Sequence, residues 1–312
     1  MGTRRRLTLF ALASIFFGGT FVAAKAGLEF FPPLLFVALR FDIAAVVLLA
    51  YLAVGPSHDE MLPQSVGDVI GIVATGVFVI GLSNALLFVG QQYVSSGVGA
   101  IIFSLNPILT PVFAMVLLTN ERLSSRGAVG MLVGLVGVAL VVQVDPSNLL
   151  GGGALWKAVV FLGAVSGALG TVVIRWADTS LSSTVRTAWA LPLSSLLTHG
   201  LSFASGETLA MISWTPAAVA ALVYVGVFAG AFAYIAYFGL LDDVGPIHGN
   251  LVFYAVPIVA TLGGSVLLGE SVSSLTLVGF ATIFAGFGVL ASKSIVAEVE
   301  RLYEGQVEAL TT

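Results

Sequence analysis

The chain of 312 residues contains no cysteine and very few charged residues. Without cysteine it forms no disulfide and no thiolate metal site. Charged residues make up 9% of the sequence and hydrophobic residues 58%, which leaves too little charge to cover the surface of a soluble protein. The mean hydropathy of +1.07 points the same way. The composition therefore excludes a soluble globular protein and indicates an integral membrane protein.

Sequence motifs of ATP-driven pumps and of membrane enzymes are missing as well. None of the three lysines follows a glycine, which excludes the phosphate-binding loop G-x-x-x-x-G-K. The chain has no G-x-S-x-G stretch, and its three histidines are far apart without H-E-x-x-H spacing. The net charge of -4 is scattered, so it does not indicate a nucleic-acid partner. We therefore expect no enzyme and no cofactor.

Long apolar stretches follow one another along nearly the whole chain. A hydrocarbon core about 30 Å thick needs about 20 apolar residues per helix, and membrane strands are only about ten alternating residues long. The sequence thus predicts an all-α membrane protein with short connections and no soluble domain. The ten predicted spans lie near residues 7–27, 34–54, 67–89, 95–118, 126–144, 154–174, 185–204, 215–238, 246–268 and 275–292.

The positions of the lysines and arginines predict the orientation. Cytoplasmic loops carry an excess of these residues. With ten spans and a cytoplasmic N-terminus, nine of the twelve fall inside, two near the outer face and one within a span. The inside group is Arg4, Arg5, Arg6, Arg122, Arg126, Arg175, Arg186, Lys293 and Arg301. We expect a multi-pass protein of the cell membrane with both termini in the cytoplasm.

The second half of the chain repeats the first. Residues 93–121 resemble residues 243–270, with Pro107 opposite Pro257 and, after one deletion, Glu121 opposite Glu270. A duplicated unit of five spans crosses the membrane in the opposite sense the second time, because five is odd. The predicted units are residues 1–146, an inverted copy over 147–292, and a short cytoplasmic tail over 293–312.

Three patterns carry a resemblance to a known family. They are "FFGGTFVAAK" at the end of the first span, "LRF" at 39–41, and a Pro...Glu...Gly pattern that closes each half. The chain resembles the drug/metabolite transporter superfamily, in particular its EamA-type members with two tandem five-helix domains. Phe17-Gly18 departs from the family, which often has Trp before this glycine. The resemblance covers roughly residues 7 to 292.

The resemblance implies a secondary transporter of amino acids, their relatives or other small solutes. Export or exchange would proceed by alternating access around a central cavity, with protons or a counter-substrate as open candidates for coupling. The expected partners are a small-molecule substrate and the lipid bilayer. A channel-like pore or a lipid-moving protein stays open as the alternative. The sequence does not identify the substrate, the direction of transport or the oligomeric state.

The paired prolines predict two helix breaks. A proline cannot donate to the carbonyl four residues earlier, so Pro107 and Pro257 free two carbonyls at mid-membrane depth. Such breaks are tolerated where protein or water satisfies them. Helical spacing places polar residues and prolines on one stripe in each half: Ser104, Pro107 and Pro111, and then Asn250, Tyr254, Pro257 and Thr261. The stripes line a cavity in one interpretation and are structural kinks in the other.

Features present in only one half are the better candidates for a substrate site. Arg40 lies within the second span and Lys25 near the end of the first. A cation at the centre of a membrane helix costs around 3 kcal/mol, so Arg40 either faces the protein and anchors an anionic or zwitterionic substrate, or it extends to the outer headgroups. Asp42 lies about 200° around the helix and cannot share its face.

The remaining candidates are weaker. Asn84, Asn106 and Trp189 line the cavity in one interpretation and make interhelical contacts in the other. Glu121 and Glu270 recur in both halves at span ends, which favours a structural role over a proton relay.

Overall fold

The computed structural model describes residues 3–54, 61–118, 125–142, 152–249, 251–286 and 288–289. Within these ranges every regular element is a helix. Six helices are long and apolar enough to cross a membrane. They are Arg4–Gly27, Pro33–Ala53, Val66–Gln91, Ser96–Leu117, Gly153–Ala177 and Pro216–Leu241. The expected all-helical membrane protein is therefore confirmed.

Shorter or more polar helices account for the other predicted spans. Ser125–Val141, Val252–Leu268 and Ser274–Gly286 are apolar but shorter, and α10 (Ser183–Ala204) is more polar. Ten crossings in two inverted halves stay a prediction, because these shorter helices do not by themselves have the length of a full span. Glu121, Asn250 and the tail 293–312 lie outside the described residues.

Each long span begins as an α-helix, but two of them widen in the middle. In one, α4 (Val66–Ala74) and α5 (Ser83–Gln91) enclose the π-helix η1 (Thr75–Leu82). In the other, α11 (Pro216–Val223) and α12 (Ala233–Gly249) enclose the π-helix η3 (Tyr224–Phe232). The wide turn leaves carbonyls to be met from outside the helix. Around η1, the hydroxyls of Ser194 and Ser166 donate to the carbonyls of Gly76 and Phe78 at 2.8 and 2.9 Å.

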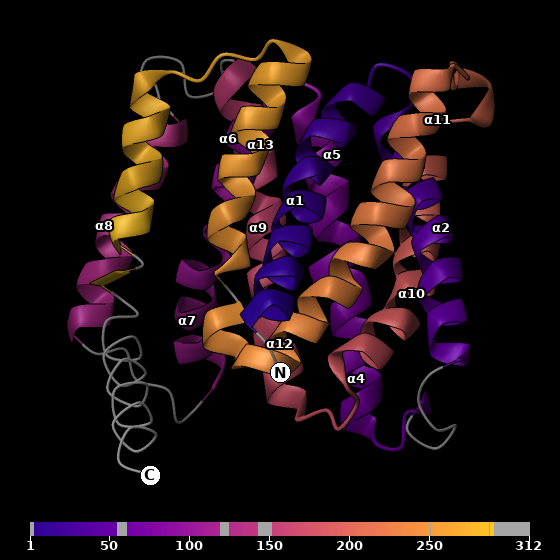
Figure 1. Cartoon of the computed structure of the whole chain (residues 1–312), viewed down its shortest axis with the longest axis horizontal. Coiled ribbons are helices and arrows are strands. Elements are labelled where there is room, and N and C mark those ends of the chain that lie inside the picture. The colour runs from indigo at the N-terminus through magenta and orange to yellow at the C-terminus, as the bar shows by residue number, and fades with distance from the viewer. Residues whose placement is uncertain are drawn as a thin grey trace.

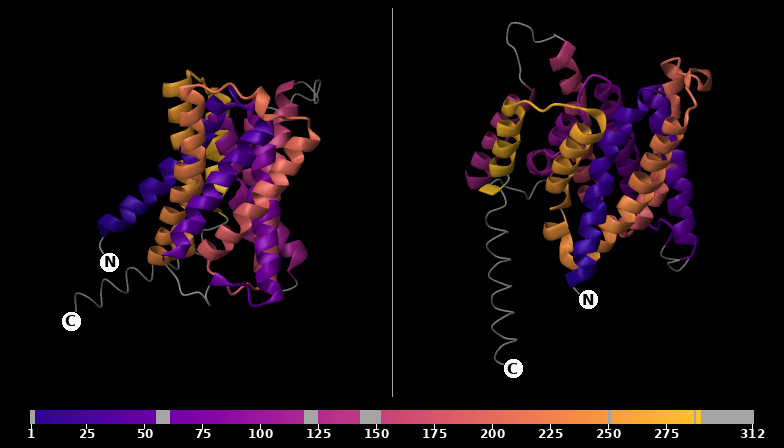
Figure 2. Two further views of the ribbon diagram at one scale, coloured as in Figure 1. Left: turned by 90° about the vertical axis from the view of Figure 1, so that its right-hand side faces the viewer. Right: turned by 45° about the horizontal axis from the view of Figure 1, so that its top comes forward.

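The helices form a flat bundle (Figure 1). The central helix α1 (Thr3–Gly27) packs against α12 and α13 (Val252–Leu268). The helix α2 (Pro33–Ala53) lies beside α10 at one end of the bundle, where each also contacts the π-helix of the opposite half of the chain. The helix α9 (Gly152–Ala177) packs against α5, η1 and α7 (Asn106–Leu117). Figure 2 shows that the first turns of α1 lean away from the other helices.

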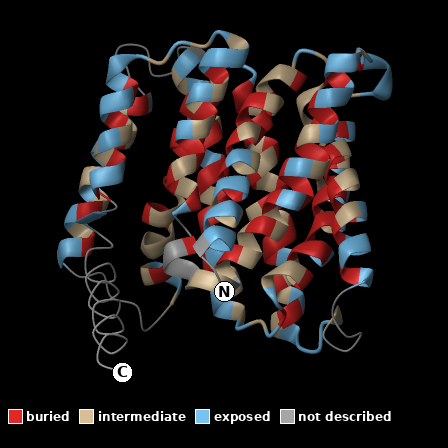
Figure 3. Cartoon of the chain, viewed as in Figure 1, coloured by how far each residue is buried: buried red, intermediate tan, exposed pale blue. Residues whose placement is uncertain are grey.

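The opposite end of the bundle is formed by α8 (Ser125–Val142) and the helix Ser274–Gly286. Their outward faces are largely exposed, whereas buried residues gather along the inner helices (Figure 3). Glycines bring the two backbones together: a Cβ atom on Gly137 would lie 2.7 Å from the carbonyl oxygen of Gly279, and one on Gly286 would lie 2.6 Å from that of Gly130. Glycine permits this close approach.

Serine and threonine side chains start several helices. The hydroxyls of Ser65, Ser95, Ser182 and Thr215 each accept a bond from the backbone N–H three residues later. These are N-cap bonds, which satisfy donors that have no partner inside the helix. At Ser65 the carboxylate of Asp68 also accepts from the backbone N–H of Ser65, which completes a capping box.

Candidate functional site

Arg40 is a buried cation in the middle of α2. The residue is 3% exposed, and its guanidinium carbon lies 5.0 Å from the ring centre of Phe41 and 5.2 Å from that of Phe88. Its Nε and Nη1 atoms have no hydrogen-bond partner among the described residues. The side chain is thus held by two aromatic faces, and its burial does not fit extension to the lipid headgroups.

Aromatic side chains of the second half approach this guanidinium. Tyr234 of α12 lies within electrostatic range of Arg40. The ring of Tyr234 contacts Phe17 of α1 at 5.2 Å between centres, and Phe17 in turn contacts Tyr237 and Phe253 at 5.9 and 6.0 Å. These four rings, here called the aromatic cluster, connect α1, α12 and α13 beside the cation. Such rings bury a large apolar area and keep polar edges available.

The expected helix break occurs before Pro107. The helix α6 (Ser96–Phe103) ends at Phe103, and α7 resumes at Asn106. The freed carbonyl of Phe103 accepts a hydrogen bond of 3.1 Å from the side-chain amide of Asn106. The Oδ1 atom of Asn106 is buried with no partner among the described residues, and it faces Gly167 of α9. Protein thus satisfies this carbonyl, as the structural alternative expected. Ser104 is buried and donates to the carbonyl of Ile101 at 2.7 Å.

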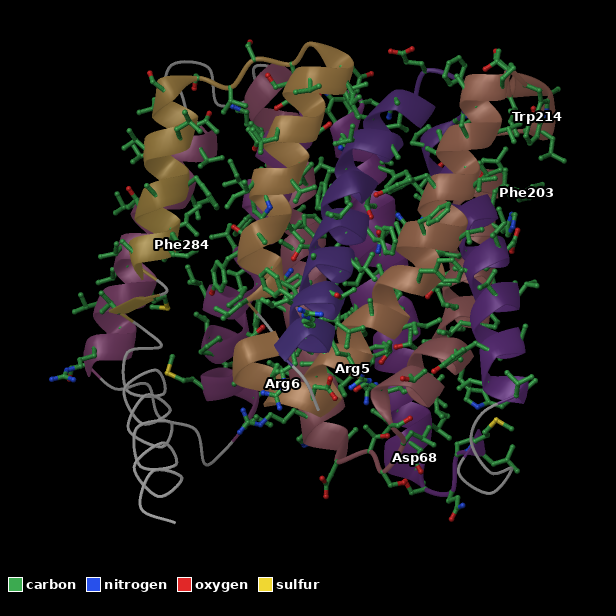
Figure 4. The ribbon with its side chains drawn as sticks, in the orientation of Figure 1. Arg5, Arg6, Asp68, Phe203, Trp214 and Phe284 are labelled. Atoms are coloured by element: carbon green, nitrogen blue, oxygen red, sulfur yellow. The ribbon has the colours of Figure 1, made fainter. Side chains whose placement is uncertain are left out.

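The second proline lies within a helix. The helix α13 continues through Pro257, so the break expected there does not occur in the described residues. One missing donor in a helix of 17 residues is tolerated, whereas the chain at Pro107 turns before the proline. Tyr254 is buried, and its ring packs edge-on against Phe284 at 5.0 Å between centres. Phe284 belongs to the edge helix (Figure 4), so Tyr254 points away from the aromatic cluster.

Lys25 lies at one end of the bundle and has protein partners. Its ammonium donates to the carbonyls of Gln91 and Gln92, both at 2.9 Å. A lysine bound to the last carbonyls of a helix stabilises that helix end. Glu270 lies within electrostatic range of Lys25, and its carboxylate accepts from the backbone N–H of Ser96 at 2.9 and 3.0 Å. These contacts favour structural roles for Lys25 and Glu270.

Asn84 and Trp189 also have local partners. The side-chain amide of Asn84 donates to the carbonyl of Ile80 at 2.8 Å, and the indole of Trp189 donates to that of Met61 at 2.7 Å. Trp189 is 41% exposed. Arg40, Asn106 and Lys25 therefore have three different environments, and only Arg40 is both ionised and unpartnered at its Nε and Nη1 atoms.

Two carboxylate contacts between distant segments were missed by the sequence reasoning. Asp68, at the end of the bundle that also holds Arg5 and Arg6 (Figure 4), accepts from the backbone N–H of Ser180 at 2.8 Å, just before α10. Glu207 accepts from the backbone N–H of Leu35 at 2.7 Å, in the first turn of α2. Each carboxylate thus binds the start of a helix that lies more than 100 residues away. The pattern Ser65-x-x-Asp68 was a signal for the first contact, because it matches a capping box.

Comparison with known proteins identifies the family. The family model described as "EamA-like transporter family" matches residues 5–143 and again residues 154–292. The chain belongs to the EamA-like transporter family. This confirms the resemblance expected from the sequence.

Curated relatives of this EamA-like chain are named as transporters. An uncharacterized transporter of Archaeoglobus fulgidus is 23% identical over 93% of this chain and 99% of its own length. The uncharacterized inner membrane transporter YedA of Escherichia coli strain K12 is 26% identical over 93% of this chain and 94% of its own. A chloroplastic WAT1-related protein of Arabidopsis thaliana is 27% identical over 90% of this chain and 68% of its own.

A solved structure shares the fold. It has a TM-score of 0.59 and 22% identity, and the match covers 93% of this chain and 98% of the other. Its title, "Crystal structure of protein", names no activity. Family and relatives together indicate a membrane transporter of small solutes rather than an enzyme.

Proposed function

We propose that this EamA-like protein is a secondary transporter of small organic anions or zwitterions, and that Arg40 binds the carboxylate of the substrate. The single observation that carries the proposal is a buried guanidinium whose Nε and Nη1 atoms have no acceptor in the described residues. A buried charge without a partner is costly. A carboxylate matches the planar guanidinium and forms charge-assisted hydrogen bonds with it.

The surroundings of Arg40 suggest the rest of the substrate. The ring of Phe88 lies 5.2 Å from the guanidinium carbon, Tyr234 lies within electrostatic range of it, and the aromatic cluster continues from Tyr234. Rings of this kind hold an apolar group and exclude water, which strengthens a nearby charge pair. A small carboxylate with a compact apolar body therefore fits this environment better than a polyanion does.

Three features support two five-helix units of opposite orientation, over residues 1–146 and 147–292. First, the family model matches once in each unit. Second, each unit contributes one carboxylate to the other: Asp68 binds the chain just before α10, and Glu207 binds the start of α2. Third, the glycine contacts are reciprocal. Gly130 and Gly137 correspond to Gly279 and Gly286 in the repeat, and the close contacts pair Gly137 with Gly279 and Gly130 with Gly286. A two-fold axis exchanges these two contacts.

Such an arrangement fits alternating access. In transporters built from inverted repeats, the substrate site lies between the repeats, and one repeat moves against the other around it. Arg40 and Phe88 come from the first unit and Tyr234 from the second. We infer cytoplasmic termini, with Arg5, Arg6 and Asp68 at the inner face and Trp214 at the outer face, which Figure 4 shows at opposite ends.

A binding experiment tests the proposal. The purified protein is heated in the presence of small aliphatic and aromatic carboxylates, each compared with its own amide. A ligand at 100 times its Kd stabilises the folded state by about 2.7 kcal/mol. We expect some carboxylates, but not their amides, to raise the Tm of the wild type and of Arg126→Gln, an exposed control. Arg40→Gln should lose this effect. Equal stabilisation of Arg40→Gln and wild type would refute the role of Arg40.

A further inference from the structure

A second ionisable group of α2 lies on the opposite side of the helix from Arg40. The Oδ2 atom of Asp42 lies 2.9 Å from Nε2 of His199 in α10. The hydroxyl of Ser195, one turn earlier in α10, donates to Oδ1 of the same carboxylate. The side chains of Asp42 and His199 are 46% and 41% exposed. We call Asp42, Ser195 and His199 the α2–α10 triad.

The triad lies within the depth of the membrane helices. Asp42 is the tenth of the 21 residues of α2, about 14 Å along the helix from its first residue. His199 lies five residues before the end of α10, about 8 Å from that end. An ionised carboxylate at this depth is costly. The two ionisable side chains of the triad are nevertheless only about half buried, and they lie within about 14 Å of a helix end.

The charge of the triad changes by one when it takes up a proton. With a neutral imidazole and an ionised Asp42, its charge is -1. A proton from water brings the charge to zero, whether it resides on the imidazole or on the carboxylate. Release returns the proton to water, so no other reactant is required. Histidine and acidic side chains are the groups that carry protons in many pumps and transporters.

Arg40 and Asp42 of the triad lie in one short segment of α2. With Arg40 charged and Asp42 ionised, the two positions sum to zero. A substrate carboxylate at Arg40 brings the sum to -1, and a proton on the triad restores it to zero. Because uncompensated charge is unfavourable at this depth, carboxylate binding and proton binding favour each other, and by linkage the coupling is reciprocal.

Several other ionisable side chains on the elements packed around the triad have partners of their own. Arg186 of α10 donates to the hydroxyls of Thr75 and Ser183, and the hydroxyl of Tyr224 donates to the carbonyl of Ile15. Among the side chains that the structure describes, the other ionisable groups on α2, α4, α10, η3 and α12 and before α11 are Arg40, Tyr51, Asp68, Arg186, Glu207, Tyr224, Tyr234, Tyr237 and Asp243. Asp42 and His199 bind each other between α2 and α10.

We propose that the α2–α10 triad is a proton-binding site, and that its proton accompanies a carboxylate substrate bound at Arg40. The coupling to a substrate rests on the function proposed above, whereas proton binding by the triad does not. Movement of α2 against α10 would change both sites together, because α2 carries Arg40 and Asp42. One carboxylate and one proton are then transported together, and their charges sum to zero.

The first experiment needs no organic substrate. Vesicles containing the full-length protein are adsorbed to a solid-supported membrane and given a pH jump, and the transient charge displacement is recorded. We expect a transient in the wild type that falls to the level of protein-free vesicles in Asp42→Asn and in His199→Gln. Both changes keep the size of the side chain and its capacity to hydrogen-bond. His58→Gln removes a histidine elsewhere and should keep the transient.

Each outcome bears on the proposal. Arg40→Gln should keep the pH-jump transient while losing carboxylate binding, which separates a failure of the triad from a failure of the proposed function. An unchanged transient in folded Asp42→Asn or His199→Gln, judged by elution and Tm, would overturn the proposal. A lower Tm combined with a normal transient in these variants would show that the triad only joins two helices, and this result would also overturn the proposal.

The second experiment tests the coupling. Vesicles are loaded with a fluorescent pH indicator and given a carboxylate that stabilises the wild type in the heating experiment, with its amide as the control. We expect carboxylate entry to acidify the lumen of wild-type vesicles, and His199→Gln to bind the carboxylate without this acidification. Equal acidification by His199→Gln and wild type would overturn the coupling.

Discussion

The buried carboxylate of Asp68 offers a sharp test of how the two halves are joined. Asp68 is 0% exposed. Its Oδ1 atom accepts from the hydroxyl of Thr179 and the backbone N–H of Ser180, both at 2.8 Å. Its Oδ2 atom accepts from the backbone N–H groups of Gln64 and Ser65, both at 3.1 Å. Replacement by asparagine removes the charge but preserves the shape of the side chain.

The expected loss follows from these contacts. Asparagine keeps one oxygen, which we expect to face Thr179 and Ser180, and its NH2 group then faces the N–H groups of Gln64 and Ser65. Two hydrogen bonds to a charged group, at roughly 1.5–3 kcal/mol each, are lost. Both of these residues are exposed, so water replaces part of the loss. We expect Asp68→Asn to lower the free energy of unfolding by about 2–4 kcal/mol, or Tm by roughly 4–8 °C.

The assay is thermal unfolding of the purified protein, with Asp178→Asn as the matched control. Asp178 lies in the connection between α9 and α10, which also holds Thr179 and Ser180. Its φ of 50° is one that asparagine adopts readily. Its replacement should change stability by less than about 0.5 kcal/mol. If Asp68→Asn unfolds at the same temperature as Asp178→Asn, the carboxylate does not join α4 to α10 in the way described here.

Three further predictions concern packing and helix ends. Gly137→Ala should lower Tm, because the new Cβ would lie 2.7 Å from the carbonyl oxygen of Gly279. Gly200→Ala is the control, because a Cβ there would have no other atom within 4 Å, and its Tm should stay the same or rise. Equal Tm shifts in the two variants would contradict the close contact. Glu270→Gln keeps one acceptor oxygen for the N–H of Ser96 but removes the charge, so it should destabilise the protein by about 1–3 kcal/mol. A Tm like that of the wild type would refute this. Asn106→Leu should lower Tm because it leaves the carbonyl of Phe103 without its amide donor, and an unchanged Tm would show that water or another group serves equally well.

Much of the helical architecture could be predicted from the sequence, because the apolar stretches are long and the connections short. The break before Pro107 was expected from the missing proline donor, and the burial of Arg40 agrees with one of the two alternatives that the cost of a cation in the bilayer left open. The opposite sides of Arg40 and Asp42 followed from the helical repeat. Each of these depends on the chemistry of one short segment.

Contacts between distant segments could not be predicted in the same way. Glu207 binds the start of α2 and Asp42 binds Ser195 and His199, although each pair is separated by more than 150 residues. Helix packing decides such contacts, and no local pattern encodes it. The same holds for Pro257, which the sequence equated with Pro107 although α13 continues through it.

The most direct measurement for the whole account is counterflow in liposomes. Vesicles containing the protein are loaded with a carboxylate that raises Tm, and uptake of the same labelled compound is followed against an outside concentration series. A transporter with its site at Arg40 should show transient, saturable accumulation that Arg40→Gln abolishes and Arg126→Gln retains. Flux that rises linearly with concentration would contradict a transporter, and accumulation that Arg40→Gln leaves intact would contradict a substrate site at Arg40.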